Sequence, residues 1–138
     1  MIAVPDRTTP PPVSDFSRLV MPPLRHITLG NGLPLHVIDQ ASQEVCCLTC
    51  VWRGGLAEAP SRTVAQLMLN LLREGTRGHT GEIIADRLEF NGARLMTSVD
   101  SHYSVVKLYM LNSKAADVVP LLPELFLEPV FPDTAFNT

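Results

Sequence analysis

The sequence has 138 residues, of which 46% are hydrophobic and 18% are charged, and its formal net charge is −3. This length and composition fit one globular domain with a sizeable core. The negative charge and the scattered Lys and Arg residues argue against nucleic-acid binding, and no apolar run reaches the roughly 18 residues of a membrane-spanning helix.

The N-terminal region is rich in proline. Residues 1–23 contain six of the 12 prolines, which predicts an extended arm with polyproline character. We expect the single domain to occupy residues 24–138. The first residues also lack the basic and apolar segments of a secretory signal.

The segment LRHITLGNGLPLHVI, residues 24–38, alternates apolar and polar residues on both sides of Asn31-Gly32. This pattern predicts a β-hairpin with a type I′ turn. Pro34 cannot donate a ladder hydrogen bond, so we expect it at a strand start or an outer edge. His26 and His36 fall on opposite arms and can approach each other, but we interpret them as unrelated exposed residues.

A strand is predicted over residues 44–53, EVCCLTCVWR, with Trp52 in the core. The segment is apolar at both parities, so we expect it to be covered on both faces. Cys46, Cys47 and Cys50 lie within it, and the two-residue period of a strand directs Cys47 and Cys50 to opposite faces. We therefore interpret the thiols as buried small hydrophobic groups, with a redox or metal role as the alternative.

Two helices are expected next. Ser61 or Thr63 can cap the first, and Gly75 can end it in the left-handed conformation. Thr80 can cap the second, and Gly92 can terminate it.

The remainder predicts strands near 93–99 and 102–111, then a helix capped by Ser113 and disturbed by Pro120 and Pro123. The order β-β-β-α-α-β-β-α predicts an α+β fold with helices on one face of a mainly antiparallel sheet. Asp100 and His102 would share a strand face in this reading, but no nucleophile stands out beside them.

Four segments in this order carry a family resemblance: LGNGLPLHVI, VWRGGLAE, LLREGT and EIIADRLEFNGARL. Together they resemble the N-terminal part of the pitrilysin/insulinase-type zinc peptidases, which include mitochondrial processing peptidase. The resemblance spans roughly residues 24–132. It implies an α+β domain that forms half of a pitrilysin-like unit.

The family resemblance also implies a lost metal site. Family members carry an inverted zinc motif, H-x-x-E-H, on the first helix. Here its two histidines fall on Gln66 and Asn70, and its glutamate falls on Leu69. Amides are poor ligands for Zn²⁺, leucine accepts no proton, and the family's third ligand would lie beyond residue 138. The resemblance therefore implies an inactive member with no catalytic residue, metal ligand or cofactor.

Inactive members of this family act as partner, chamber-forming or peptide-binding halves of peptidase assemblies. In active relatives the substrate adds as a strand to a sheet edge near the zinc helix. The segment that resembles this edge is ARLMTSVDSHY, residues 93–103. It offers Leu95, Met96, Thr97 and Ser98 as candidate peptide-binding residues.

Two alternatives remain open. The chain can be a fragment of a larger active zinc metallopeptidase with its site in another domain or subunit, or a structural core-type subunit, as in respiratory complex III. The expected partners are a second copy, covering an edge left bare at residue 138, or an active zinc peptidase subunit, and extended peptides. The Pro-rich arm favours the bacterial periplasm or envelope, whereas the clustered thiols favour a reducing compartment; we expect the envelope.

Overall fold

The computed structural model describes residues 8, 20–39 and 43–136. Contacts divide the chain into two compact units, residues 1–42 and 43–138. Most of the Pro-rich arm predicted over residues 1–23 lies outside the described residues. In the part of the chain that is described, no helix is long and apolar enough to cross a membrane.

The first unit contains the predicted hairpin. Strands β1 (Leu24–Thr28) and β2 (Pro34–Ile38) are antiparallel, and Pro34 begins β2 as expected. The turn type differs from the prediction: the Gly32 N–H donates to Leu29 O over 2.8 Å, and Gly32 has a φ of 83°. No described residue other than glycine has a positive φ. This is a type I turn followed by a left-handed glycine, not a type I′ turn.

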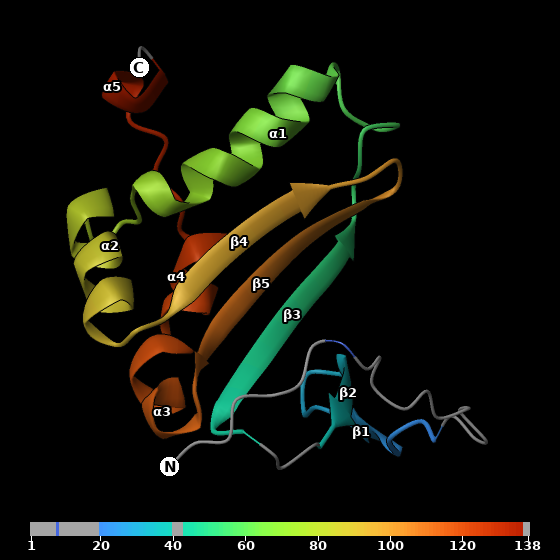
Figure 1. The fold of residues 1–138 in the computed structure, drawn as a ribbon. Coiled ribbons are helices and arrows are strands. Elements are labelled where there is room, and N and C mark those ends of the chain that lie inside the picture. The colour runs from blue at the N-terminus through green and yellow to red at the C-terminus, as the bar shows by residue number, and fades with distance from the viewer. Residues whose placement is uncertain (1–7, 9–19, 40–42, 137–138) are drawn as a thin grey trace. The chain divides into compact units, whose positions relative to one another are not determined.

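The second unit is built on a three-stranded antiparallel sheet in the order β3-β5-β4 (Figure 1). Its strands are β3 (Val45–Arg53), β4 (Arg94–Val99) and β5 (Tyr103–Leu111). Its helices are α1 (Arg62–Leu71), α2 (Gly81–Phe90), α3 (Ala115–Val118), α4 (Leu121–Leu127) and α5 (Asp133–Phe136), with single 3₁₀ turns η1 (Leu72–Glu74) and η2 (Asn112–Lys114). The α+β prediction is confirmed.

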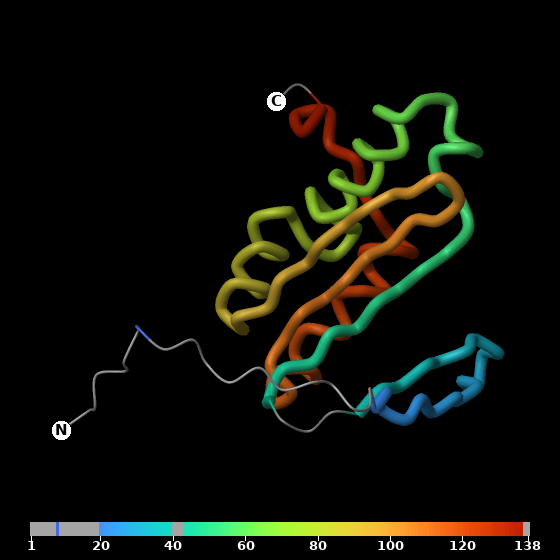
Figure 2. Tube along the Cα trace, turned by 45° about the vertical axis from the view of Figure 1, so that its right-hand side comes forward, coloured from blue at the N-terminus to red at the C-terminus, as the bar shows by residue number. Residues whose placement is uncertain are grey.

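The core lies between one face of this sheet and helices α1 to α4. Figure 2 shows the sheet and these helices from a second direction. Val106 and Leu108 of β5 are 1% exposed, whereas Val45 and Val51 of β3 are 53% and 57% exposed. The prediction that β3 is covered on both faces is therefore wrong for the described residues. Valine favours strands for conformational reasons as well as burial, so an apolar residue at each parity does not require two covered faces.

The helix starts follow the sequence signals. The Ser61 hydroxyl accepts from the Val64 N–H at the start of α1, and the Thr80 hydroxyl accepts from the Ile83 N–H at the start of α2. Each side chain satisfies a backbone donor that the first helical turn leaves unpaired. Gly92, with a φ of 61°, ends α2 as predicted.

Two helix ends differ from the predictions. α1 passes into η1, and Gly75 is extended, with a φ of 163°, rather than left-handed. The helix expected from Ser113 is broken into η2, α3 and α4, with Pro120 directly before α4. Proline lacks the N–H that a continuous helix needs at that position, so one apolar pattern yields separate short helices.

Asp100 lies in the turn between β4 and β5, not on a strand face shared with His102. Its Oδ1 accepts from the His102 N–H at 2.9 Å and from the Tyr103 N–H at 2.7 Å. These two backbone hydrogen bonds lower the pKa of the Asp100 carboxyl. The carboxylate therefore shapes the turn and does not orient an imidazole.

The loop after β3 packs against this turn at Gly55. A Cβ on Gly55 would meet the His102 nitrogen at 2.5 Å and the Asp100 carbonyl oxygen at 2.6 Å, and both are backbone atoms that cannot easily move. We expect Gly55→Ala to lower the free energy of unfolding by about 1–3 kcal/mol. Urea unfolding will measure it. Gly78→Ala is the control, because the added methyl meets Glu124 at 3.7 Å; equal losses would contradict the prediction.

Candidate functional site

Helix α1 carries the three positions of the predicted vacated zinc motif, and the structure separates them. Gln66 and Asn70 are exposed and line a shallow hollow of about 340 Å³ with residues of the same helix. Leu69 is 0% exposed and lies in the core cluster. The two amides are thus accessible to solvent, whereas Leu69, on which the sequence resemblance places the family's glutamate, is part of the hydrophobic core.

Asn70 contacts the strand that the sequence singled out as a peptide-binding segment. The Thr97 hydroxyl donates to the Asn70 side-chain oxygen over 3.2 Å, joining β4 to α1. The two candidate regions, which lie 27 residues apart in the sequence, therefore meet in one place. Figure 1 shows α1 beside β4.

Strand β4 is an edge strand: in the described part of the chain it pairs only with β5. The Asp100 N–H donates to Tyr103 O, which makes this pair a hydrogen-bonded one. Such pairs alternate along an antiparallel ladder. Met96 and Ser98 therefore bond to β5, and the backbone groups of the residues between and beside them point to the open edge; these are Leu95, Thr97 and Val99.

A groove of about 750 Å³ borders this edge. One side is formed by β4, including Leu95, Met96 and Thr97; the other side is formed by η1 and α2. Leu95 and Thr97 are half-buried, whereas Met96 is 44% exposed and Ser98 is also exposed, on the uncovered face of the sheet. The arrangement leaves room for an extended chain along the open edge, with α2 as the facing wall.

The wall contributes carboxylates and apolar side chains to the groove. Glu82 and Glu89 of α2 line it together with Ile84 and Leu88, which are buried, and Arg94 lines it from β4. The apolar residues sit at helical spacing and belong to the core. The charged residues are exposed, so they are accessible to the side chains of an extended chain in the groove.

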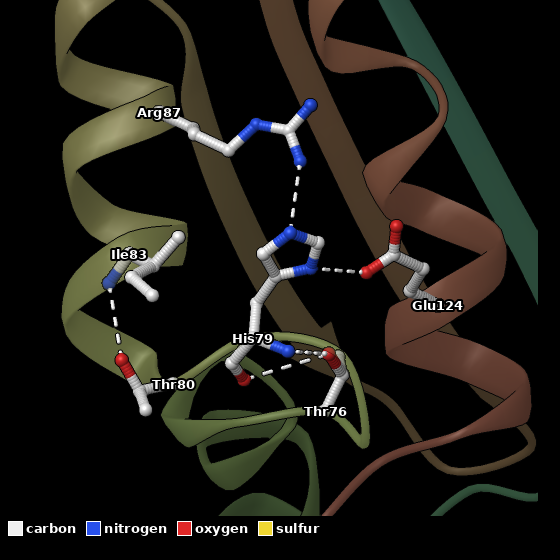
Figure 3. A network of polar contacts seen from close by, with 6 residues as sticks. All are labelled: Thr76, His79, Thr80, Ile83, Arg87 and Glu124. Carbon is white, nitrogen blue, oxygen red and sulfur yellow. Dashed lines mark hydrogen bonds and ion pairs between the residues drawn. The ribbon is translucent and has the colours of Figure 1, made fainter.

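A polar cluster that the sequence did not reveal fixes the segment before α2 (Figure 3). His79 Nδ1 lies 2.7 Å from a Glu124 carboxylate oxygen, and its Nε2 lies 3.5 Å from Arg87 Nη1. A guanidinium only donates, so Nε2 accepts and Nδ1–H donates to Glu124. The cluster connects α2, α4 and the turn containing Thr76, whose hydroxyl accepts from the His79 N–H. The cluster therefore fixes the N-terminal end of α2, which forms one side of the groove.

The cysteines follow the predicted strand geometry, with Cys47 and Cys50 on opposite faces of β3. Cys46 and Cys50 are half-buried and pack against the core, while Cys47 is exposed on the other face of β3. The interpretation of all three as buried is wrong for Cys47 and holds only in part for Cys46 and Cys50, which are half-buried. Burial raises the pKa of the Cys50 thiol. Within the described residues, no group of three or more His, Cys, Asp or Glu side chains is arranged to hold a metal ion.

No protein-family model and no curated protein matches this sequence. Solved structures do match. The structure of a peptidase M16 inactive domain from Pseudomonas fluorescens aligns with a TM-score of 0.74 at 20% identity, over 83% of this chain and 29% of that chain. This chain has the fold of part of an M16 peptidase. A protease from Helicobacter pylori aligns with a TM-score of 0.73 at 13% identity, over 86% of this chain and 29% of its own.

The M16-like fold confirms the structural resemblance expected from the sequence motifs. The likeness extends over most of this chain, which spans about 29% of the length of either matched structure. At these identities it is a likeness of fold. The M16-like topology agrees with the predicted helices and antiparallel strands in their order.

Proposed function

We propose that this chain is a non-catalytic M16 peptidase-like domain that binds extended peptides along the open edge of β4. The observation that carries the proposal is the groove between β4 and α2, which borders the open edge of β4 at Leu95 and Thr97, whose backbone groups the ladder alternation directs outward. Backbone pairing with such an edge gives affinity that depends little on peptide sequence.

The residues of α1 support the non-catalytic part of the proposal. Gln66 and Asn70 are amides, which bind zinc poorly. Leu69 is fully buried, so it could not be exchanged for a solvent-accessible carboxylate without disturbing the core. One of the matched structures is itself described as an M16 inactive domain. Asn70 instead stabilises β4 through its hydrogen bond to Thr97.

The proposal is tested by measuring turnover, zinc binding and peptide binding on the same sample. We expect no hydrolysis of unstructured fluorogenic peptides with added Zn²⁺, and saturable binding of fluorescein-labelled unstructured peptides in an anisotropy titration. Hydrolysis, or a bound Zn²⁺ that is lost in both Gln66→Ala and Asn70→Ala, would contradict the non-catalytic assignment. Absence of peptide binding would contradict the binding assignment.

We extend the proposal to the assembly in which the domain works. A domain that binds peptide without cleaving it needs an active zinc peptidase subunit, or a second active domain in a longer chain, if it is to serve proteolysis. The span of about 29% of each matched structure agrees with a role as one part of a larger unit. A structural core-type role is the outcome if peptides fail to bind.

A further inference from the structure

The hairpin of the first unit places two histidines opposite each other. His26 of β1 and His36 of β2 are register partners, and both are exposed. Their Nδ1 atoms are 2.8 Å apart, and their ring centroids are 4.8 Å apart with an interplanar angle of 89°. The antiparallel register therefore brings two nitrogen ligand atoms to one point on the surface.

The contact between the two Nδ1 atoms is a hydrogen bond in which one ring supplies the proton. A neutral imidazole has one N–H and one nitrogen lone pair, so two Nδ1 atoms at 2.8 Å need one donor and one acceptor. Replacing the shared proton by a metal ion would use both Nδ1 lone pairs. Each ring would then carry its proton on Nε2.

The distance between the two Nδ1 atoms favours metal ions of one coordination geometry. Imidazole nitrogens bind first-row divalent ions at about 2.0–2.1 Å. Two nitrogens 2.8 Å apart would subtend roughly 85° at the ion, whereas a tetrahedral ion would place them about 3.4 Å apart. A near-right angle matches the square-planar or tetragonal preference of Cu²⁺ and Ni²⁺ rather than the tetrahedral preference of Zn²⁺.

We propose that His26 and His36 form a two-histidine site for a divalent transition-metal ion with tetragonal preference, Ni²⁺ or Cu²⁺, with water completing the coordination. The ion bridges β1 and β2 in the middle of their ladder. The site lies wholly within the hairpin and does not depend on the proposed peptide binding at β4.

The test is a calorimetric titration of the full chain with Ni²⁺, which avoids oxidation of the thiols. We expect His26→Gln and His36→Gln each to weaken binding by about tenfold or more, because a single exposed imidazole is a poor ligand on its own. His102→Gln, at an exposed turn position, is the matched control and should bind like the unaltered chain. Equal affinities in all of these variants would overturn the proposal.

A second measurement needs no substitution and so does not depend on the variants folding. Six-coordinate Ni²⁺ with imidazole and water ligands is paramagnetic and broadens the imidazole carbon-bound proton signals of histidines that coordinate it. Substoichiometric Ni²⁺ should broaden the signals of His26 and His36 before those of His79 and His102. Simultaneous broadening of all four histidines, or broadening that begins elsewhere, would overturn the site.

Discussion

Replacing Thr97 by proline is expected to weaken the binding of extended peptides by about tenfold or more, while the sheet stays folded. The Thr97 backbone N–H faces the open edge of β4, as the alternation of the β4–β5 ladder requires. Proline removes this donor, and its ring occupies the edge where the peptide would pair. No β4–β5 hydrogen bond is lost, and proline is tolerated on edge strands.

Two further variants make this prediction specific. Thr97→Val removes the hydroxyl that bonds Asn70 but keeps the backbone N–H, so it should bind peptide nearly as well as the unaltered chain. Met96→Pro removes an N–H that pairs with β5, so it should destabilise the sheet itself. Anisotropy titrations report binding and circular dichroism reports folding. A folded Thr97→Pro variant that binds normally would contradict β-augmentation at β4.

Replacing Leu69 by alanine is expected to lower the free energy of unfolding by about 2–5 kcal/mol. Leu69 is 0% exposed and belongs to the cluster formed by α1, η1, α2, α3, α4 and β5. Truncation removes the buried methyl groups and leaves a cavity that close-packed neighbours fill only in part. Urea unfolding followed by circular dichroism measures the effect.

The neighbouring Met68 provides a control on the same helix. It is 41% exposed, so Met68→Ala should change stability by less than about 1 kcal/mol. Leu69→Glu should be at least as damaging as Leu69→Ala, because it would bury an unpaired carboxylate. A stable Leu69→Glu chain would show that this position can face solvent and would contradict the assignment of Leu69 to the core.

Much of the fold could be predicted from local signals. Ser61 and Thr80 mark helix starts, Gly92 marks a helix end, and the alternation around residues 24–38 marks the hairpin. These features depend on neighbouring residues, which a sequence displays directly. The burial of β3 was predicted wrongly because tertiary context decides it: Val45 and Val51 are exposed, and no described helix covers their face of β3.

The resemblance implied that the two candidate segments, on the first helix and on the edge strand, lie near each other, but the contact that joins them was not predicted. The Asn70–Thr97 hydrogen bond joins residues whose proximity follows from the packing of α1 on β4. The contact between His79 and Glu124 spans 45 residues and leaves no local pattern. The His26–His36 approach was visible as a possibility once the hairpin register was known, but the distance between the rings depends on their rotamers.

The most direct measurement for the central claim is residue-resolved amide hydrogen exchange of the chain with and without a bound peptide. In the free chain the amides of Met96 and Ser98 should exchange slowly, because they pair with β5, and those of Leu95, Thr97 and Val99 should exchange faster. Peptide binding should slow exchange at these last three positions. Unchanged exchange at all three positions under saturating peptide would contradict the claim that β4 is the peptide-binding edge.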